Sequence, residues 1–297
     1  MSSCQLREAF MGEKVFPWSH ILRLLPPRNA AVVACVCRTW RDTVLQLRSR
    51  DVACGTEAVF ILAEDAASAR ALGSSFTYTR EQTLWEDIDE TAGSEACNDA
   101  NNLHAVGCTC TFDSCAGGCP CPCSLSGFEC GPACGCKISC NNRTSQQRTS
   151  CLLSVKRTRC GYGVFLEAPV AAGAFVCTYA GEVLPFVEAA RRQELPTEHR
   201  YVMAVREHAG STLVTHFIDP SVFGNVGRFV NHSCDGGCLE SRVVRASGVL
   251  APRVAFFARR ALAASEELTF QFGSPTASGS KACLCNTAAC LGRMPCD

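Results

Sequence analysis

The sequence lacks an excess of charge of either sign and lacks long hydrophobic runs. Its 28 Lys and Arg residues balance its 28 Asp and Glu residues, so charge alone indicates neither a nucleic-acid binder nor an acidic tail. No stretch reaches the roughly 18 uninterrupted apolar residues of a membrane span, and the N-terminus lacks the features of a secretory signal. We therefore expect a soluble, intracellular protein with no membrane partner.

Cysteine, by contrast, is abundant and unevenly placed. Of 24 cysteines in 297 residues, five fall in residues 1–107, ten between Cys108 and Cys140, and four in the last fifteen residues. In a reducing compartment such closely spaced thiols are expected to bind zinc, whereas in a secreted protein they would form disulfides. A chain of this length can hold about two domains and a sizeable core.

Residues 1–50 predict a small helical module. A Leu-Pro-Pro step at residues 25–27 separates two short helical patterns, and apolar residues recur at near 3.6-residue spacing over residues 31–44. The simplest interpretation is a pair of packed helices. The Leu-Pro-Pro step followed by V-C-R-x-W-R at residues 36–41 resembles an F-box, and this resemblance implies binding to a Skp adaptor of a cullin ubiquitin ligase.

Residues 51–104 are expected to be a connector, partly acidic. The pattern predicts a short strand at residues 59–62 and a short helix at residues 65–72. An acidic run follows, and we expect it to be solvated: Glu81, Glu86, Asp87, Asp89 and Glu90.

Residues 105–145 carry the densest cysteine cluster. Thiolates one or three residues apart can converge on tetrahedral zinc, and the intervening glycines and prolines leave little apolar surface to bury. Metal is therefore expected to supply much of the folding free energy. Two ordinary sites need eight thiolates, so bridging ligands could absorb the remainder of the ten: Cys108, Cys110, Cys115, Cys119, Cys121, Cys123, Cys130, Cys134, Cys136 and Cys140.

This spacing resembles the pre-SET region of SUV39-type histone lysine methyltransferases. The resemblance implies about three zinc ions sharing nine cysteines through bridging thiolates. Cys119, Cys121 and Cys123 offer three thiols where that pattern uses two, so we expect either Cys119 or Cys123 to be surplus. Saturated thiolate sites leave no open position for chemistry, so this region is expected to be a scaffold.

Residues 146–274 predict β runs at 162–166, 175–179, 201–206 and 253–258, and one helix at 184–194. Four motifs follow in order: G-Y-G-V-F from residue 161, Y-A-G-E-V from 179, N-V-G-R-F-V-N-H-S-C from 225 and E-E-L-T-F from 266. Together they resemble a SET domain, with particular similarity to the SET half of the SET-mariner fusion methyltransferases. The implied fold is α+β and mainly β, with small sheets, zinc-stapled pre-SET and post-SET regions, and the helical N-terminal module.

The resemblance implies S-adenosylmethionine as cofactor. Gly161 and Gly163 lack Cβ atoms, which permits close backbone approach to a ligand. The expected cofactor-binding residues are Gly161, Tyr162, Gly163, Tyr201, Arg228, Phe229, Asn231 and His232.

Residues 279–297 predict a further zinc site. Cys283, Cys285 and Cys290 provide three ligands, one too few for a closed tetrahedron. The resemblance to post-SET regions implies Cys234 as the fourth ligand. Cys238 and Cys296 are spare thiols that could replace a ligand.

The expected catalytic residues are Tyr201, Phe270 and Phe272. The SET pattern ends in E-L-x-F-D-Y, but Phe272 replaces that tyrosine here, so the hydroxyl is absent and we expect a loss of rate. A second departure is Asp235-Gly236-Gly237 where the pattern has x-P-N.

Two functions follow from these patterns. The first is an S-adenosylmethionine-dependent histone lysine N-methyltransferase acting on histone tails or nucleosomes, located in the nucleus on chromosomes. The alternative is a catalytically weak or inactive SET-like binding module that acts as an F-box-type ubiquitin-ligase adaptor.

Overall fold

The strands of the chain form four small sheets that share one apolar core. The computed structural model describes residues 59–62, 75–85, 107–111, 114–115, 119–147, 149–194, 201–209, 212–249, 251–273 and 281–295. The predicted F-box-like module and the helix predicted at 65–72 lie outside these residues. The α+β, mainly β class is confirmed, and no helix of the described residues has the length and apolarity to span a membrane.

The largest sheet has the strand order β1-β4-β5-β14-β11. A hairpin forms its centre, in which β4 and β5 are antiparallel and bury valines from both strands. Strand β14 pairs antiparallel with β5 and parallel with β11, although the three are far apart in sequence. The bounds are β1 Val59–Leu62, β4 Leu153–Thr158, β5 Gly161–Leu166, β11 Asn231–His232 and β14 Glu267–Phe270.

A second sheet has the order β12-β13-β6, all antiparallel. Its strands are β6 (Phe175–Tyr179), β12 (Leu239–Val244) and β13 (Arg253–Ala258). The predicted runs at 175–179 and 253–258 coincide with β6 and β13. Strand β13 is buried along nearly its whole length, and its Phe256 lies in the common core.

A third sheet, with the order β3-β7-β9-β8, carries helix α8. Its elements are β3 (Thr83–Leu84), β7 (Glu182–Leu184), α8 (Phe186–Glu194), β8 (Met203–Ala209) and β9 (Thr212–Asp219). The helix was predicted to begin at Leu184, but that residue ends β7. Leu184 precedes Pro185, and a residue before proline is disfavoured in helical conformation.

The segment expected to be a connector contributes strands to this core. Besides β1 and β3, strand β2 (Thr77–Tyr78) pairs with β10 (Phe223–Gly224), and the ring of Phe76 is buried in the core. Residues 59–62 and 75–85 therefore belong structurally with the SET sheets, while the domain boundaries remain predictions.

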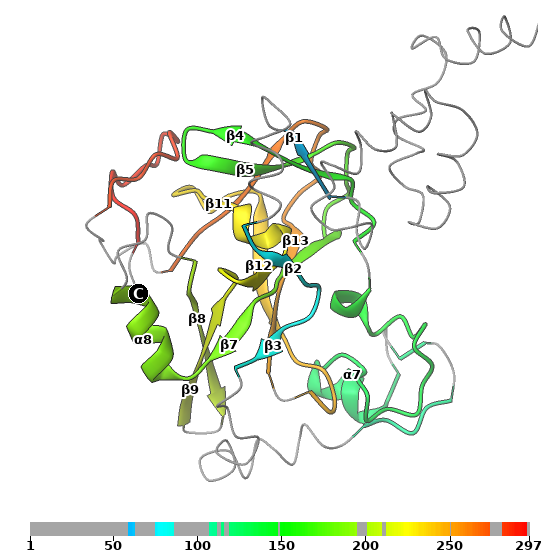
Figure 1. The fold of residues 1–297 in the computed structure, drawn as a ribbon. Helices are drawn as coiled ribbons and strands as arrows, with labels where there is room; N and C mark the ends of the chain where they lie inside the picture. Colours follow the sequence, from blue (N-terminus) through cyan, green and yellow to red (C-terminus); the bar gives the residue numbers. More distant parts are fainter. Residues whose placement is uncertain are drawn as a thin grey trace, which may run out of the picture.

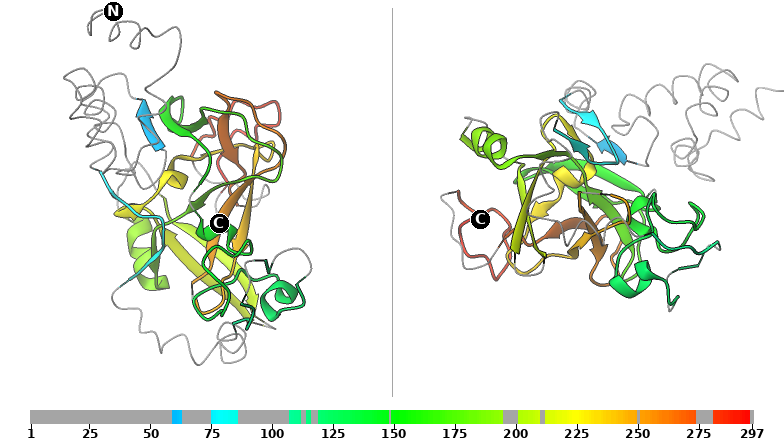
Figure 2. Two further views of the ribbon diagram at one scale, coloured as in Figure 1. Left: turned by 90° about the vertical axis from the view of Figure 1, so that its right-hand side faces the viewer. Right: turned by 90° about the horizontal axis from the view of Figure 1, so that it is seen from below.

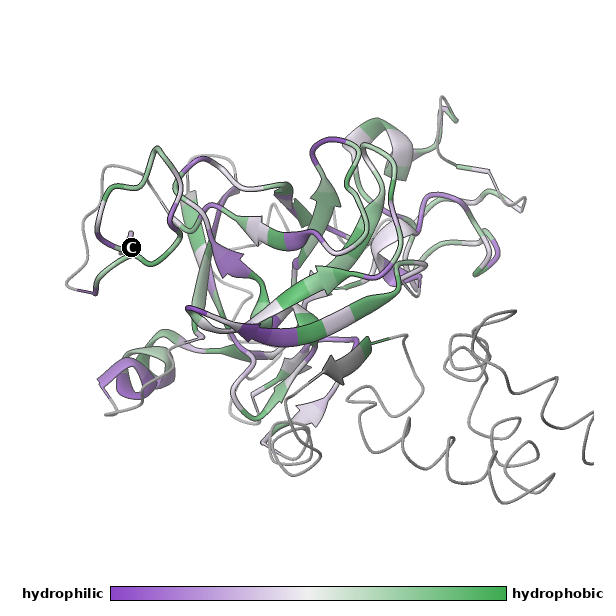
Figure 3. Ribbon diagram, turned by 90° about the horizontal axis from the view of Figure 1, so that it is seen from above, coloured by the Kyte–Doolittle hydropathy of each residue, from purple (hydrophilic) through white to green (hydrophobic). Residues whose placement is uncertain are grey.

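The two cysteine-rich regions lie at opposite ends of the molecule. Helix α7 (Pro122–Ser126) marks the first, and the red C-terminal segment marks the second (Figures 1 and 2). The strands between them carry many hydrophobic residues, drawn in green in Figure 3. Glu129 anchors the first region to the sheets. Its backbone N–H donates a hydrogen bond to the Arg245 carbonyl, and its carbonyl accepts one from the Ser247 N–H. Its carboxylate accepts hydrogen bonds from Ser145 and Gln146.

Candidate active site

Pairing of β11 with β14 brings two of the predicted motifs together. In this register Asn231 lies opposite Thr269 and His232 lies opposite Phe270. The preceding 3₁₀ helix η2 (Val226–Phe229) carries Arg228 and Phe229 to the same end of the sheet. Residues predicted to bind the cofactor thus lie beside Phe270, one of the residues expected to be catalytic.

Arg228 lies among aromatic rings with part of its guanidinium unsatisfied. Its Cζ is 4.3 Å from the ring centroids of both Phe76 and Tyr201, and 5.3 Å from that of Phe229. Among the described residues, its buried Nε and Nη1 have no hydrogen-bond partner. Because orphaned buried donors are costly, this side chain fits a site that takes an anionic or polar ligand group, such as the carboxylate of S-adenosylmethionine.

Strand β5 forms the neighbouring wall. Gly161 has φ +105°, a conformation that favours glycine, and the space where its Cβ would stand is open. Gly163 differs: an added Cβ would lie 2.6 Å from Glu267 Oε1 and 3.0 Å from Asn231 Nδ2. Its missing side chain therefore makes room for the Asn231–Glu267 hydrogen bond of 2.8 Å. Tyr162 is partly buried and packs on Phe229, with 6.4 Å between ring centroids.

His232 links Phe272 to Cys234, which lies among the C-terminal cysteines. Its Nδ1 accepts a hydrogen bond from the Phe272 backbone N–H at 3.0 Å. A neutral imidazole must then carry its proton on Nε2, which lies 3.1 Å from Cys234 Sγ. Burial lowers the pKa of His232 and favours this neutral form. Both ring nitrogens are thus engaged, so a cofactor would meet this residue through its backbone.

A continuous row of aromatic rings forms the apolar wall of the site. Phe272 lies 5.3 Å from His232 and 4.6 Å from Phe270, and Phe270 lies 4.7 Å from Phe256. Tyr179 continues the row beyond Phe256 at 6.4 Å. Phe272 is partly exposed and offers an apolar surface suited to the methylene chain of a lysine, while Phe270, Phe256 and Tyr179 are buried and support it from behind.

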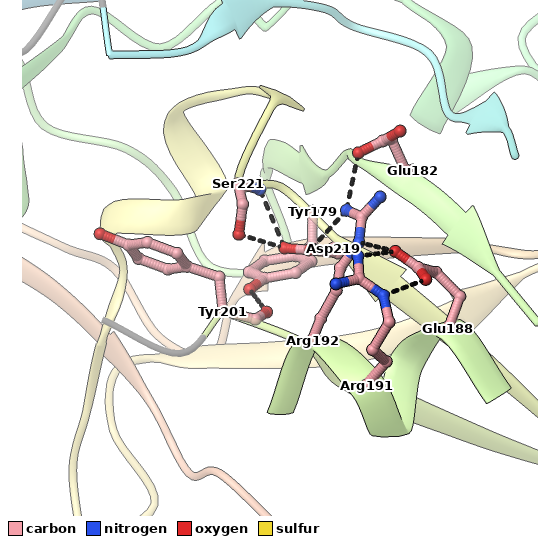
Figure 4. A network of polar contacts seen from close by, with 8 residues as sticks. All are labelled: Tyr179, Glu182, Glu188, Arg191, Arg192, Tyr201, Asp219 and Ser221. Atoms are coloured by element: carbon pink, nitrogen blue, oxygen red, sulfur yellow. Dashed lines mark hydrogen bonds and ion pairs between the residues drawn. The ribbon is translucent and has the colours of Figure 1, made fainter. Parts of the chain in front are cut away.

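Tyr179 is not among the predicted site residues, although it begins the Y-A-G-E-V motif. Its hydroxyl donates to the backbone carbonyl of Tyr201. Burial raises its pKa, and the Asp219 carboxylate raises it further, so the hydroxyl stays protonated. Figure 4 shows the Tyr201 ring pointing away from Asp219, consistent with its position against Arg228.

Beneath these tyrosines, Arg192 joins three elements. Its Nη1 lies 2.8 Å from Glu182 Oε2 of β7 and 2.7 Å from Asp219 Oδ2 of β9, and its Nε lies 2.8 Å from Glu188 Oε1 of α8 (Figure 4). Asp219 also accepts hydrogen bonds from the N–H and hydroxyl of Ser221. No local sequence pattern marks this network, because its members come from separated segments.

The C-terminal cysteines and Cys234 form one candidate metal site. The four sulfurs of Cys234, Cys283, Cys285 and Cys290 lie within 4.8 Å of one another, and tetrahedral zinc with bonds of about 2.3 Å needs sulfurs about 3.8 Å apart. Burial opposes ionisation of Cys285, but hydrogen bonds from Thr287 lower its pKa to about 6. Cys238 instead packs in the core, bonded to Glu267 and Thr269, and Cys296 lies outside the described residues.

The pre-SET cysteines form three overlapping groups of four, each suited to zinc. Arg143 donates to Cys136 Sγ at 3.6 Å and Asn142 to Cys130 Sγ at 3.4 Å, which offsets part of the negative charge that thiolates would bring. The groups are Cys108, Cys130, Cys134 and Cys136; Cys108, Cys110, Cys115 and Cys121; and Cys115, Cys130, Cys136 and Cys140. Cys119 and Cys123 lie beside them, 3.8 Å from Cys110 and 3.4 Å from Cys134 respectively.

Comparison with known families finds two matching domains. The SET domain family matches residues 161–273, and the F-box domain family matches residues 17–51. The second match agrees with the predicted N-terminal module, whose residues the structure does not describe.

Relatives and solved structures agree with these domains. The chain is 39% identical to Arabidopsis thaliana histone-lysine N-methyltransferase SUVR3, covering 57% of this chain and 52% of that protein, and so spans about half its length. It is 31% identical to mouse histone-lysine N-methyltransferase SETMAR, over 86% of this chain and 92% of that protein. The crystal structure of the human SETMAR methyltransferase domain superposes with TM-score 0.67 at 29% identity, covering 84% of this chain and 98% of that one.

A structure of KRYPTONITE, determined in complex with mCHH DNA, an H3(1-15) peptide and SAH, superposes with TM-score 0.65 at 26% identity. It covers 82% of this chain and 53% of that one. These comparisons favour an S-adenosylmethionine-dependent methyltransferase over an inactive adaptor. The extent of the match to mouse SETMAR, together with the fold and the cysteine groups, shows that the chain belongs to the SUV39-like family of SET-domain histone-lysine N-methyltransferases.

Proposed function

We propose that this chain methylates lysine side chains of histone tails with S-adenosylmethionine, and that it does so without a hydroxyl at position 272. One observation carries the proposal: the hydrogen bond between the Phe272 N–H and His232 Nδ1 joins the cofactor-binding motif to the wall of the lysine channel. This bond would hold the residues that bind the cofactor in a fixed position relative to Phe272, which would contact the lysine.

The residues have separate roles in this proposal. When bound, the cofactor supplies an electrophilic methyl group on a cationic sulfur. Arg228 holds its anionic end, and Gly161 and the backbone at Asn231-His232 admit the rest. Gly163 acts indirectly, by leaving room for Asn231 to be held against Glu267.

The aromatic row prepares the lysine. Phe272 would line the side chain with apolar surface, supported from behind by the buried rings of Phe270 and Phe256, and this disfavours an ammonium ion and so favours the neutral amine that can attack. They also hold the chain extended and exclude water, and such positioning accounts for much of the rate in a direct displacement. Tyr201 completes the wall on the side of Arg228.

Tyr179 supplies the hydroxyl that Phe272 lacks. Its proton is committed to the Tyr201 carbonyl, so its oxygen remains an acceptor for an amine N–H. That bond would orient the nitrogen lone pair toward the methyl group.

The test measures transfer of labelled methyl groups to core histones and nucleosomes by the zinc-loaded full chain. We expect measurable transfer by the unaltered protein, a loss on the order of 10²-fold for Tyr179→Phe, and a gain for Phe272→Tyr. The control is Phe165→Tyr, which also adds a hydroxyl to a phenylalanine ring but does so on the β4–β5 hairpin, where the ring lies under Lys156. This variant should leave the rate unchanged. Absence of transfer by every variant, including Phe272→Tyr, would overturn the proposal.

The finer assignments rest on the relatives. The H3(1-15) peptide in the KRYPTONITE structure supports a histone H3 tail as substrate and hence a nuclear, chromosomal location. The F-box match supports binding of a Skp adaptor by residues 17–51, so the enzyme would be brought to a cullin ubiquitin ligase. Co-purification with Skp that is lost in Leu25→Ala and Trp40→Ala, with methyl transfer intact, would support this partner; failure of the intact chain to bind Skp would refute it.

A further inference from the structure

The pre-SET region holds more thiols than its three groups can use. Three tetrahedral zinc ions have twelve ligand positions, and the three groups contain eight different sulfurs. Eight thiolates fill twelve ligand positions only if four of them each bridge two zinc ions. The four that belong to two groups at once are Cys108, Cys115, Cys130 and Cys136. Cys130 and Cys136 would then both bridge the same pair of ions.

Cys123 relieves this crowding. Its sulfur is buried and lies 3.4 Å from that of Cys134, which places it at the first group. If Cys123 takes the position of Cys136 in the first group, Cys136 no longer bridges two ions and binds only the zinc ion of the third group. Nine thiolates, three of them bridging, then fill the twelve positions, and one cysteine of the ten is left.

The remaining thiol, Cys119, stands at the second group. Its sulfur lies 3.8 Å from that of Cys110, the separation that two ligands of one tetrahedral zinc ion adopt at bond lengths of about 2.3 Å. Cys121 interacts with the thiols of Cys119, Cys110 and Cys115. The second group therefore has five thiols for four positions, and Cys119 and Cys121 are separated only by Pro120.

We propose that Cys119 is a reserve ligand of the second zinc position, interchangeable with Cys121. Cys121 is the resident ligand because it is 6% exposed and belongs to the group, whereas Cys119 is more exposed. In an exchange Cys119 releases its proton as it binds, and the displaced Cys121 thiolate takes one up, so the charge of the site is unchanged. The second ion can therefore lose one bond without leaving the cluster.

The test counts zinc per chain in the purified full-length protein. Cys119→Ser and Cys121→Ser should each retain the zinc content of the unaltered protein, because either thiol completes the second group, and the double variant should lose at least one ion. Cys140→Ser is the matched control: Cys140 is a terminal ligand of the third group, and the described residues place no spare thiol there, so this variant should lose zinc alone. The proposal fails if Cys121→Ser loses as much zinc as Cys140→Ser, or if the double variant loses none.

A second measurement works on the unaltered protein, in case the variants fold poorly. Iodoacetamide treatment of the zinc-loaded chain, followed by peptide mapping, should modify Cys119 before the other nine thiols of the region. Protection of Cys119 with modification of Cys121 or Cys123 would overturn the assignment. Both readouts are independent of methyl transfer, so they stand or fall separately from the proposed activity.

Discussion

Replacing Arg192 with alanine should destabilise the protein far more than any surface substitution on α8. Its guanidinium is the cation that contacts both Glu182 and Asp219. The Asp219 side chain is 1% exposed and that of Glu182 is 9% exposed, so removing Arg192 leaves two carboxylates close together with little water to solvate them.

The expected loss follows from this burial. Breaking a buried ion pair by removing one partner costs about 3–5 kcal/mol, because the other charge is left uncompensated. Loss of the contact between Arg192 and the Trp85 ring, 4.7 Å apart, adds about 0.5–1 kcal/mol. The hydrogen bonds from Ser221 to Asp219 remain and favour the lower end of the range. The total is about 3.5–6 kcal/mol, and at roughly 2–4 °C per kcal/mol the melting temperature should fall by about 7–24 °C.

Urea unfolding of the zinc-loaded chain, followed by circular dichroism, measures this effect. Arg191→Ala is the control, since Arg191 pairs with the same Glu188 but is 60% exposed and should leave the midpoint unchanged. Adding Asp219→Asn to Arg192→Ala should recover part of the loss, because one uncompensated charge is removed. Equal midpoints for Arg192→Ala and Arg191→Ala would refute the reasoning.

Three further predictions concern packing, pH and metal. Gly181→Ala should cost about 1–3 kcal/mol in the same urea assay, because its Cβ would lie 2.6 Å from the Asp219 carbonyl carbon and oxygen; an unchanged midpoint would contradict that contact. Although burial opposes ionisation of Glu207, hydrogen bonds from His216 and Arg245 lower its pKa. The ionised Glu207 carboxylate stabilises the folded protein above the unfolded pKa of about 4.3, and this stabilisation disappears as pH falls through the lower folded pKa. Glu207→Gln should therefore make the loss of stability at acid pH less steep. An equally steep loss would exclude this role. Removal of zinc by a chelator should expose residues 107–147 to proteolysis before the β core, because the pre-SET cluster is made mostly of cysteines; simultaneous cleavage of both would argue against a separately metal-dependent region.

Much of the β core could be predicted because local pattern and tertiary packing agree there. Strands at 175–179 and 253–258 were predicted to the residue, since β-rich runs are bounded by turn-forming or polar residues. The segment 75–85 was not predicted to join the core, because two-residue strands such as β2 and β3 exist only through their pairing partners.

The site shows the same division. The motif that begins at Asn225 carries Arg228, Asn231 and His232 together, and the motif that begins at Glu266 carries Glu267 and the residues after it. The sequence therefore indicates correctly that the residues within each motif lie near one another. Phe76 could not be associated with Arg228, since their contact joins segments about 150 residues apart through sheet pairing. The row of rings through Phe256 likewise follows from the β6–β13 pairing, which no local pattern encodes.

The interior position of β14 in the largest sheet sets the order in which the site can be made during translation. This strand lies between β5 and β11, yet both are synthesised before it. Until residues 267–270 leave the ribosome, the facing edges of β5 and β11 lack their native partner and are open to mispairing. The cofactor-binding and channel residues therefore come together in a late, long-range closure of the sheet, and a nascent chain halted before Glu267 would carry most of the motifs but have no assembled site.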